Sequence, residues 1–427
     1  KTMFRGVRKL PPGSCAQWDV ENGLVISRYF EPLELGIGKS DNYESGDLVE
    51  EFNGLLESAV SRRMMSDVPF GAFLSGGLDS STIVAKMSKI SDLAVSTFSV
   101  GFEDGEDSEL EYSRRVADLF GCDHNELIIR AEDLPGHLED LIHLRDAPIS
   151  EPSDIPIFLL SKFASSKVKM VLTGEGADEI LGGYDKYYLE RYGRIYRKLT
   201  PKFVRSNLVE RVFRNLPERL WRWKFAINTV GMDEDSERVP MWFGGLDGKM
   251  ISDVMRSDLR ADGPIGQNIN STNLRGILDF DQRYWLPDNL LERGDRMAMG
   301  ASIEARMPFM DVDLARFSSN LPDKMRLSGR RTKVILREAM SDDLPKSIIN
   351  RPKIGFRVPV REWFRGDLSE WVSELLVSNN SRIRKYLRSS ELTKIIGDHR
   401  AAIENHEKVI WSLINLELFL RSTESKN

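Results

Sequence analysis

The sequence predicts an α/β protein in which helices cover both faces of a parallel sheet, followed by a mostly helical C-terminal half. Between residues 49 and 172, apolar runs typical of buried strands alternate with stretches of helical period, the pattern of strands joined by crossover helices. Two glycine-rich loops, 75–81 and 174–178, each follow such a run directly. From Tyr184 onward helical patterns dominate. Ligands of such sheets bind beyond the carboxyl ends of the strands, where both loops are expected.

The individual elements are expected in the following order. The first 30 residues contain short strands with a hairpin turn at Glu21-Asn22-Gly23, and residues 31–47 mix Pro, Gly, Ser and charges as a linker does. Helices are expected at 49–65, 80–90, 109–120 and 155–164. Strands are expected at 70–74, 94–100, 126–129 and 169–172. The apolar stretch 409–420 is interrupted by polar residues, so it predicts a packed helix and not a membrane span.

Composition argues against several classes of protein. The chain of 427 residues is 41% hydrophobic and 30% charged, as ordinary globular proteins are, and its length suggests about two or three domains. A net charge of −6 argues against a nucleic-acid binder, which needs a basic surface. Two cysteines and five scattered histidines supply neither a disulfide framework nor a zinc site. Because two cysteines cannot form a disulfide framework, a reducing cytoplasm is the expected location. No signal-peptide pattern is visible.

The loop at residues 75–81 reads Ser-Gly-Gly-Leu-Asp-Ser-Ser and has the properties of a phosphate cradle. Gly76 and Gly77 let the backbone approach an anion, and the following helix directs its positive end toward it. Ser75 and Ser80 add hydroxyl donors. Asp79 would repel phosphate unless a divalent cation lies between them, which predicts Mg²⁺. The alternative is a plain turn in which Asp79 or Ser80 caps the helix, but the full string after a strand favours the phosphate site.

The second loop, 174–178, is expected to supply another metal ligand. It is a near miss to the dinucleotide fingerprint GxGxxG, because Glu179 occupies the third glycine position. Taken alone, the loop is as compatible with a tight strand-to-helix turn as with a site. Paired with Asp79 at a neighbouring strand end, Asp178 becomes a candidate ligand of Mg²⁺.

A basic segment, 328–333, ends in Lys333 and runs into a helical pattern. A lysine there could neutralise the charge that develops on a leaving pyrophosphate. Composition alone favours a simpler interpretation, in which these cations cover a solvated helix start.

The segment 288–311 is dense in charge. It holds Arg293, Asp295, Arg296, Glu304, Arg306 and Asp311 among methionines and small residues. Such density is compatible with a surface ion-pair network and equally with a polar substrate pocket, and spacing does not decide between them.

Five strings together resemble the synthetase domain of the asparagine synthetase family. They are SGGLDSS at 75–81, TFSVGF at 97–102, VLTGEGADEILGGY at 171–184, LPDNLLERGDRMAMGASIEARMPFMD at 286–311 and RTKVILR at 331–337. They occur in family order across nearly the whole chain. The resemblance implies a pyrophosphate-loop ATPase fold of the adenine nucleotide alpha hydrolase type.

The resemblance also implies roles for individual residues. Leu74 and Val100 would line the adenine pocket. The ATP phosphates would be held by Ser75, Gly76, Gly77, Asp79, Ser80 and Gly174, with Mg²⁺ on Asp79 and Asp178. Lys333 would stabilise adenylation and the pyrophosphate, while Glu175 would help deprotonate the incoming amine. The acid itself would be bound by Asp295, Arg296, Glu304 and Arg306.

The implied reaction joins ATP, aspartate and ammonia. The aspartate β-carboxylate attacks the α-phosphate to give β-aspartyl-AMP and pyrophosphate, and ammonia then displaces AMP to give asparagine. Residues 1–46 would be a remnant of a preceding glutaminase domain plus linker, and 47–427 the synthetase domain. Because Lys1 stands first and Cys15 lies in an internal segment, the chain is expected to use free ammonia or a missing glutaminase domain. A homodimer is compatible with this scheme; nucleic acid and membranes are not expected partners.

Two other functions are compatible with these motifs. A relative of the same family could amidate another carboxylate, such as a sugar acid or a peptide side chain. A nucleotide-binding regulator could keep the fold without the chemistry. The joint presence of Asp79, Glu175, Asp178 and Lys333 argues against the regulator, which would need none of them.

Overall fold

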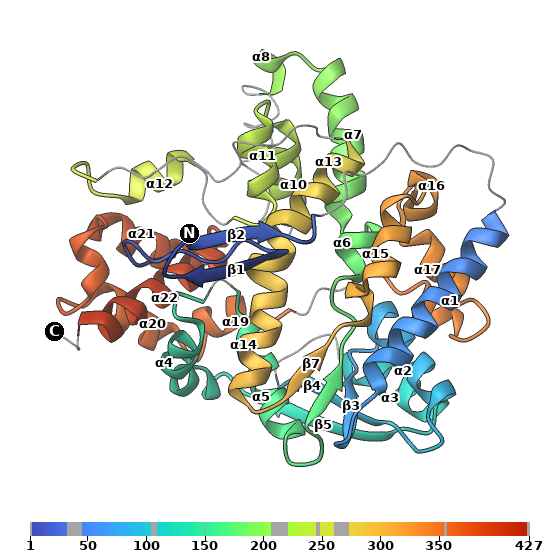
Figure 1. Cartoon of the computed structure of the whole chain (residues 1–427). Coiled ribbons are helices and arrows are strands. Elements are labelled where there is room, and N and C mark those ends of the chain that lie inside the picture. Colours follow the sequence, from blue (N-terminus) through green and yellow to red (C-terminus); the bar gives the residue numbers. More distant parts are fainter. Residues whose placement is uncertain are drawn as a thin grey trace.

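A five-stranded parallel sheet forms the centre of the protein in the computed structural model (Figure 1). The structure describes residues 2–31, 45–103, 109–149, 151–205, 221–244, 248–259, 273–353 and 357–424. The strands lie in the order β5-β4-β3-β6-β7, and every adjacent pair is parallel. Their bounds are β3 Phe70–Phe73, β4 Ser96–Phe102, β5 Asp123–Ile129, β6 Met170–Leu172 and β7 Glu304–Arg306. The predicted α/β class with a parallel sheet is therefore confirmed.

Strand order brings the two glycine-rich loops together. The chain moves outward from β3 to β4 and β5, and then returns to place β6 on the other side of β3. Gly71 lies opposite Val171 and Ala72 opposite Leu172, so both strands end at the same level. The order in which the chain adds strands thus reverses between β3 and β6, although the two strands are parallel. Sheets of this kind open a crevice at such a switch point.

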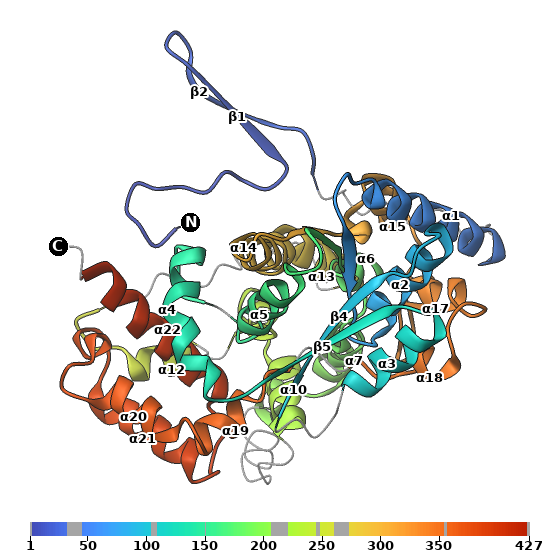
Figure 2. The same ribbon diagram turned by 90° about the horizontal axis from the view of Figure 1, so that it is seen from below.

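Helices cover both faces of the sheet, as the alternation of side chains along the strands requires (Figure 2). On β6, Met170 and Leu172 pack into one core with α1 and α2, while Val171 faces the other core with α5 and α14. Figure 2 shows α5 and α14 on one side of the strands and α2 on the other. The helices of the first half are α1 Ser45–Met64, α2 Leu78–Ile90, α3 Glu109–Leu119, α4 Asp133–Arg145, α5 Asp154–Ala164 and α6 Ala177–Leu181.

The second half is mostly helical, as expected. Near the site lie α7 Asp185–Leu199, α13 Leu274–Phe280, the π-helix η3 Asp281–Leu291, α14 Glu292–Gly300, the 3-10 helix η4 Pro308–Met310 and α17 Val334–Ala339, with a ladder of β8 Leu327–Ser328 and β9 Arg331–Thr332. Farther out lie α8 Lys202–Val204, α10 Trp221–Gly231, α11 Asp235–Met241, α12 Gly248–Val254, α15 Val312–Ser319, α16 Asp323–Arg326, α18 Lys346–Ile349, α19 Val360–Arg365, α20 Ser369–Val377, η5 Arg382–Lys385, α21 Ser389–Arg400 and α22 Glu407–Glu424. No helix in the described part of the chain has the length and apolar character needed to cross a bilayer.

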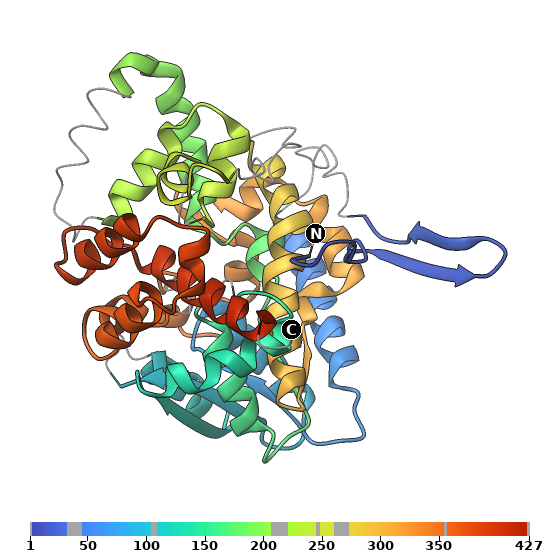
Figure 3. The ribbon, with the colours of Figure 1, turned by 90° about the vertical axis from the view of Figure 1, so that its left-hand side faces the viewer.

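At the N-terminus, the expected hairpin consists of β1 Ser14–Asp19 and β2 Gly23–Arg28, paired antiparallel around Glu21-Asn22. It projects away from the body in Figure 3, and Lys9 of the preceding segment forms an ion pair with Glu292. Most of the expected linker, residues 32–44, lies outside the described residues, and residues 45–47 already belong to α1.

Helix α4 and strand β7 are among the elements that the sequence patterns missed. Helix α4 contains Pro135 and Gly136, which read as helix breakers, although proline is tolerated in a first turn. Strand β7 is only three residues long and carries a charge at each end, so it shows no apolar run.

A substitution at Gly71 tests how closely strands β3 and β4 pack. A methyl group on Gly71 would overlap the carbonyl oxygen of Ser96 on the adjacent strand, so β3 and β4 would have to move apart. We expect Gly71→Ala to lower the free energy of unfolding by about 1–3 kcal/mol, measured by urea denaturation. The control is Gly54→Ala within α1, where the methyl group meets no atom within 4 Å and should stabilise by about 0.5–1 kcal/mol. Equal effects of the two substitutions would contradict the packing argument.

Candidate active site

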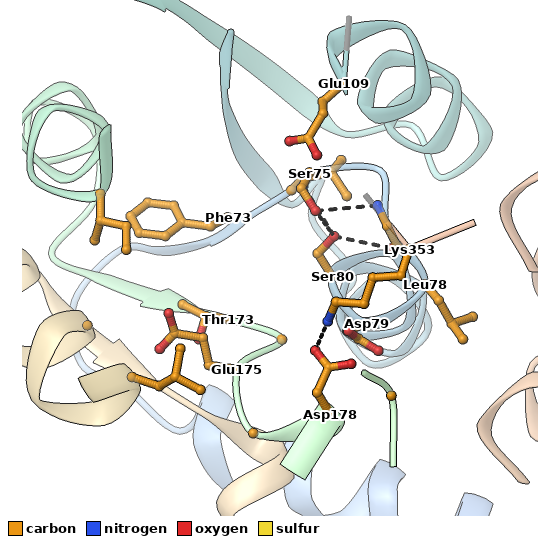
Figure 4. A pocket seen from close by; sticks show the side chains of 18 of the residues that line it. Phe73, Ser75, Leu78, Asp79, Ser80, Glu109, Thr173, Glu175, Asp178 and Lys353 are labelled. Carbon is orange, nitrogen blue, oxygen red and sulfur yellow. Dashed lines mark hydrogen bonds and ion pairs between the residues drawn. The ribbon is translucent and has the colours of Figure 1, made fainter. Parts of the chain in front are cut away.

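A cavity of about 340 Å³ opens at the carboxyl ends of β3 and β6 (Figure 4). Of the residues predicted for nucleotide, metal and amine, it is lined by Leu74, Ser75, Gly77, Asp79, Ser80, Val100, Gly174, Glu175, Asp178 and Lys333. Gly76 shapes the first loop beside it. Residues more than 250 positions apart in the chain thus line the same cavity.

The first loop folds tightly over the start of α2. The Ser75 amide donates to Ser80 Oγ at 3.2 Å, and the two hydroxyl oxygens lie 3.1 Å apart. Gly76 has a φ of +68°, and a Cβ there would lie 2.6 Å from atoms of Tyr112 and Ser113, so only glycine fits. No side chain caps α2 at Gly77. Ser80 Oγ accepts from the Ser75 amide and donates to the Gly77 carbonyl, which is compatible with the plain turn as well as with the phosphate site. Because Gly77, Leu78, Asp79 and Ser80 line the cavity, the start of α2 lies where an anion in the cavity would meet it.

The second loop rests against the first. A Cβ on Gly174 would lie 2.9 Å from backbone atoms of Asp79 and Ser80, so glycine allows the two loops to touch. Gly183 has the same function after α6, because a methyl group there would overlap Asp178 and Lys333. These contacts bring the carboxylates of Asp79 and Asp178 to opposite sides of one ammonium group.

That ammonium group belongs to Lys333. Its Nζ lies 2.6 Å from both oxygens of Asp79 and 2.7 Å from Oδ1 of Asp178. The Lys333 backbone has a φ of +51°, a left-handed conformation that is rare for a residue with a side chain. A second lysine, Lys353, contacts Oδ2 of Asp178 (Figure 4).

The lysines control the ionisation of the site. Burial disfavours the ionised form of Asp178, but the charges of Lys333 and Lys353 outweigh it and hold the Asp178 pKa well below its ordinary value of 3.8. Burial likewise acts to lower the pKa of Lys333, but Asp178 and Asp79 outweigh it and raise that pKa above 10.5. Both groups are therefore charged across the neutral range.

The two carboxylates fit a magnesium ion only if a substrate completes its ligand set. Among the described residues, no group of three or more His, Cys, Asp or Glu side chains could hold a metal. Mg²⁺ is commonly held by one or two carboxylates together with phosphate oxygens, which is the set that Asp79, Asp178 and a bound nucleotide would provide.

The end of the cavity predicted to bind adenine is apolar with a polar rim. Leu74 and Val100 are buried there, and Ser99 donates its hydroxyl to the Leu74 carbonyl. Burial raises the pKa of Glu109 to about 7, with Arg351 acting against it. The Arg351 guanidinium lies 4.0 Å from the centre of the Tyr112 ring and donates to the Ser75 carbonyl.

At the other side, Glu175 lies against α14. A Cβ on Gly294 would lie 2.7 Å from Glu175 Oε2, and this oxygen has no hydrogen-bond partner among the described residues. Burial raises the pKa of Glu175, and the nearby Arg293 counteracts it in part. Arg293 lines the cavity as well.

The four residues predicted to bind the acid lie elsewhere. Asp295, Glu304 and Arg306 line a separate surface hollow, in which Arg306 donates to the carbonyls of Arg63 and Met65. Arg296 pairs with Asp146 on the surface at 3.0 Å. None of the four lines the cavity at the carboxyl ends of β3 and β6, so the geometry does not support their assignment to the acid.

Several residues that line the cavity were not predicted from the sequence to belong to the site. They are Glu109, Tyr184, Arg293, Arg351 and Lys353. Arg293 stood within the charged segment 288–311 but could not be separated from its neighbours. The segment around Arg351 and Lys353 had no motif recognised from spacing, so no signal in the residues alone singled them out.

A substitution of Lys333, the lysine that Asp79 and Asp178 share, tests the electrostatics of the site. We expect Lys333→Met to lower the free energy of unfolding at pH 7 by about 3–5 kcal/mol, because two partly buried carboxylates lose the buried lysine that they share. Since the Asp178 pKa is depressed in the folded protein, its stabilisation exists above about pH 4 and is lost as pH falls further, so the deficit should shrink in acid. Urea denaturation between pH 3 and 7 measures it.

The matched control is Lys353→Met, which removes the more exposed lysine from the same carboxylate. A smaller loss, of about 1 kcal/mol, is expected there because water can replace that partner. An equal loss in both variants would show that Lys333 has no special electrostatic role.

Comparison with known proteins gives a consistent picture. The family model described as asparagine synthase matches residues 51–421. Asparagine synthetase (glutamine-hydrolyzing) 1 of Bacillus subtilis is 28% identical across 97% of the chain, and an asparagine synthetase (glutamine-hydrolyzing) of Triphysaria versicolor is 32% identical across 65%. Amidase chry2 of Gibberella zeae is 24% identical across 89%.

The chain spans only part of these relatives: 65% of the Bacillus protein, 46% of the Triphysaria protein and 62% of the Gibberella protein. The match to the family model nevertheless covers most of the chain and includes both strand-end loops and Lys333. The chain belongs to the asparagine synthase family.

Proposed function

We propose that this protein is an ATP-dependent amide-forming ligase that releases AMP and pyrophosphate. The observation that carries the proposal is the pair of strand-end carboxylates, Asp79 and Asp178, held on Lys333 beside an uncapped helix start in one cavity. An oxygen of the acid attacks the α-phosphorus and pyrophosphate leaves. Ammonia then attacks the acyl carbon, AMP leaves, and the amine loses a proton.

The residues of the first loop would hold the phosphates. Ser75, Ser80 and the start of α2 line the cavity, so their hydroxyls and the helix amides would serve as donors. Magnesium, when bound, would screen Asp79 and Asp178 from the phosphates and polarise the phosphoryl group. Lys333 and Lys353 carry the positive charge that would stabilise a leaving pyrophosphate.

Glu175 would receive the proton that the amine loses. Its Oε2 lacks a hydrogen-bond partner among the described residues, and burial raises its pKa, as suits a general base working near neutral pH.

Aspartate is the acid we propose, with ammonia as the amine and a glutaminase domain or free ammonia as its source. The names of the Bacillus and Triphysaria relatives support this choice. The relative named Amidase chry2 supports the second candidate, in which the same site amidates a different carboxylate.

Pyrophosphate release tests the proposal directly. With ATP, Mg²⁺ and ammonia present, candidate acids are added one at a time, and aspartate should give the fastest release. Fastest release with another acid would favour the second candidate, and no release with any acid would reject the ligase. We expect Asp79→Asn to reduce release by at least about 100-fold while the protein still unfolds in one cooperative transition, since a metal-bridging carboxylate is lost. Asp92→Asn, an exposed loop substitution, should leave release unchanged.

The role of Glu175 predicts a pH dependence. A general base works when ionised, and burial places its pKa above the ordinary 4.5, so amide formation should fall as pH drops through that raised pKa. Glu175→Gln should remove this acidic limb and lower the ratio of amide to pyrophosphate, both measured in one reaction. If amide formation by the variant still fell at acid pH in the same way, the titrating group would be another residue.

A further inference from the structure

Arg293 stands apart from the other cations of the cavity. It comes from the first turn of α14, next to Gly294, where Glu175 reaches the helix. Lys333 and Lys353 are engaged by Asp79 and Asp178. Arg293 lies instead on the side of Glu175, where the amine and its acceptor would meet.

The start of α5 holds this guanidinium in place. Arg293 donates to Ser153 Oγ at 2.9 Å, directly before α5, and its Nε lies 4.0 Å from Asp154 Oδ1. Asp154 is fully buried and also faces Arg145 of α4 at 3.6 Å. The guanidinium is thus held by Ser153 and Asp154 at the start of α5.

Arg293 is a buried cation in the wall of the cavity. It is only 8% exposed, and its Nε has no hydrogen-bond partner among the described residues. Arg145 and Arg293 both face Asp154, and the carboxyl groups of Glu151 and Glu175 also act on Arg293. Burial raises the pKa of all three carboxyl groups, so each of them holds its negative charge less firmly than an exposed one would. Arg293 thus offers a charged donor to the cavity on the side of Glu175.

The remaining described arginines of the cavity have other contacts. Arg351 lies over Tyr112 and donates to the Ser75 carbonyl. Arg337 donates to the carbonyls of Thr332 and Ile349. Arg293 is thus the described arginine on the Glu175 side that can meet an anion.

We infer that Arg293 binds a second anionic group of the acid substrate and thereby selects acids that carry one, an inference that rests on the proposed ligase function. The acid reacts through one carboxylate at the nucleotide. A second carboxylate, separated from the reacting one by a short chain, would add a negative charge beside Arg145, Asp154 and Arg293. The planar guanidinium suits this contact because it can hold a carboxylate with two parallel hydrogen bonds.

Two acids that differ only in this group test the inference. Aspartate and β-alanine present the same reacting carboxylate and amino group, but β-alanine lacks the α-carboxylate. We expect Arg293→Gln to raise the KM for aspartate about 10- to 100-fold, leaving the KM for ATP within about twofold and the value for β-alanine unchanged. Arg293→Lys, which keeps the charge but loses the fork, should show a smaller rise. If another acid emerges from the screen, its analogue without the second anionic group replaces β-alanine.

The control is Arg283→Gln on η3, whose guanidinium pairs with Asp279 outside the cavity and should leave every constant unchanged. Unfolding midpoints and ATP affinity establish that the variants are folded. An active wild type with the same ratio of aspartate to β-alanine in both Arg293 variants would overturn the inference alone. A wild type that releases no pyrophosphate with any acid would overturn the ligase proposal and this inference together.

Discussion

The shared contact of Lys333 with Asp79 and Asp178 is the interaction on which the rest of the site depends. Two carboxylates at adjacent strand ends would repel each other strongly in a buried setting, and one ammonium between them removes that repulsion. The contact also joins three segments that are distant in the chain: the turns after β3 and β6 and the start of α17. The glycines at 174 and 183 belong to the same arrangement, because any side chain there would hold the charged groups apart.

How much of this arrangement could be predicted depends on the range of the interactions involved. Strands β3 to β6 and most helices of the first half follow from local periodicity, whereas β7 and α4 show no such pattern. The pairing of Asp79 with Asp178 could also be foreseen, since neighbouring parallel strands end at one edge of the sheet. Lys333 was selected by family resemblance, because its own neighbourhood reads as a solvated helix start. Lys353 had no local pattern at all, and only tertiary packing brings it to Asp178.

The acid end shows where sequence reasoning loses its power. The segment 288–311 is a single dense run of charge, yet α14 and β7 divide it between two surfaces. Arg293 turns into the cavity, whereas Arg296, three residues later, reaches the outer surface toward Asp146. The density of charged residues in a segment gives the number of ionic side chains but not the surface that each side chain reaches. The direction is set by the packing of α14 on α4 and α5, which involves residues about 140 positions earlier.

The left-handed backbone of Lys333 has a consequence for the energetics of turnover. A residue keeps such a conformation only when its surroundings enforce it, so the ammonium group is positioned by the fold and not by its ligand. In water, dipoles must reorient as charge moves from one oxygen to another, and this reorganisation forms a large part of the barrier. A cation that is already fixed and already dehydrated needs little reorientation. The strain at one residue would then appear as a lower reorganisation energy in every catalytic cycle.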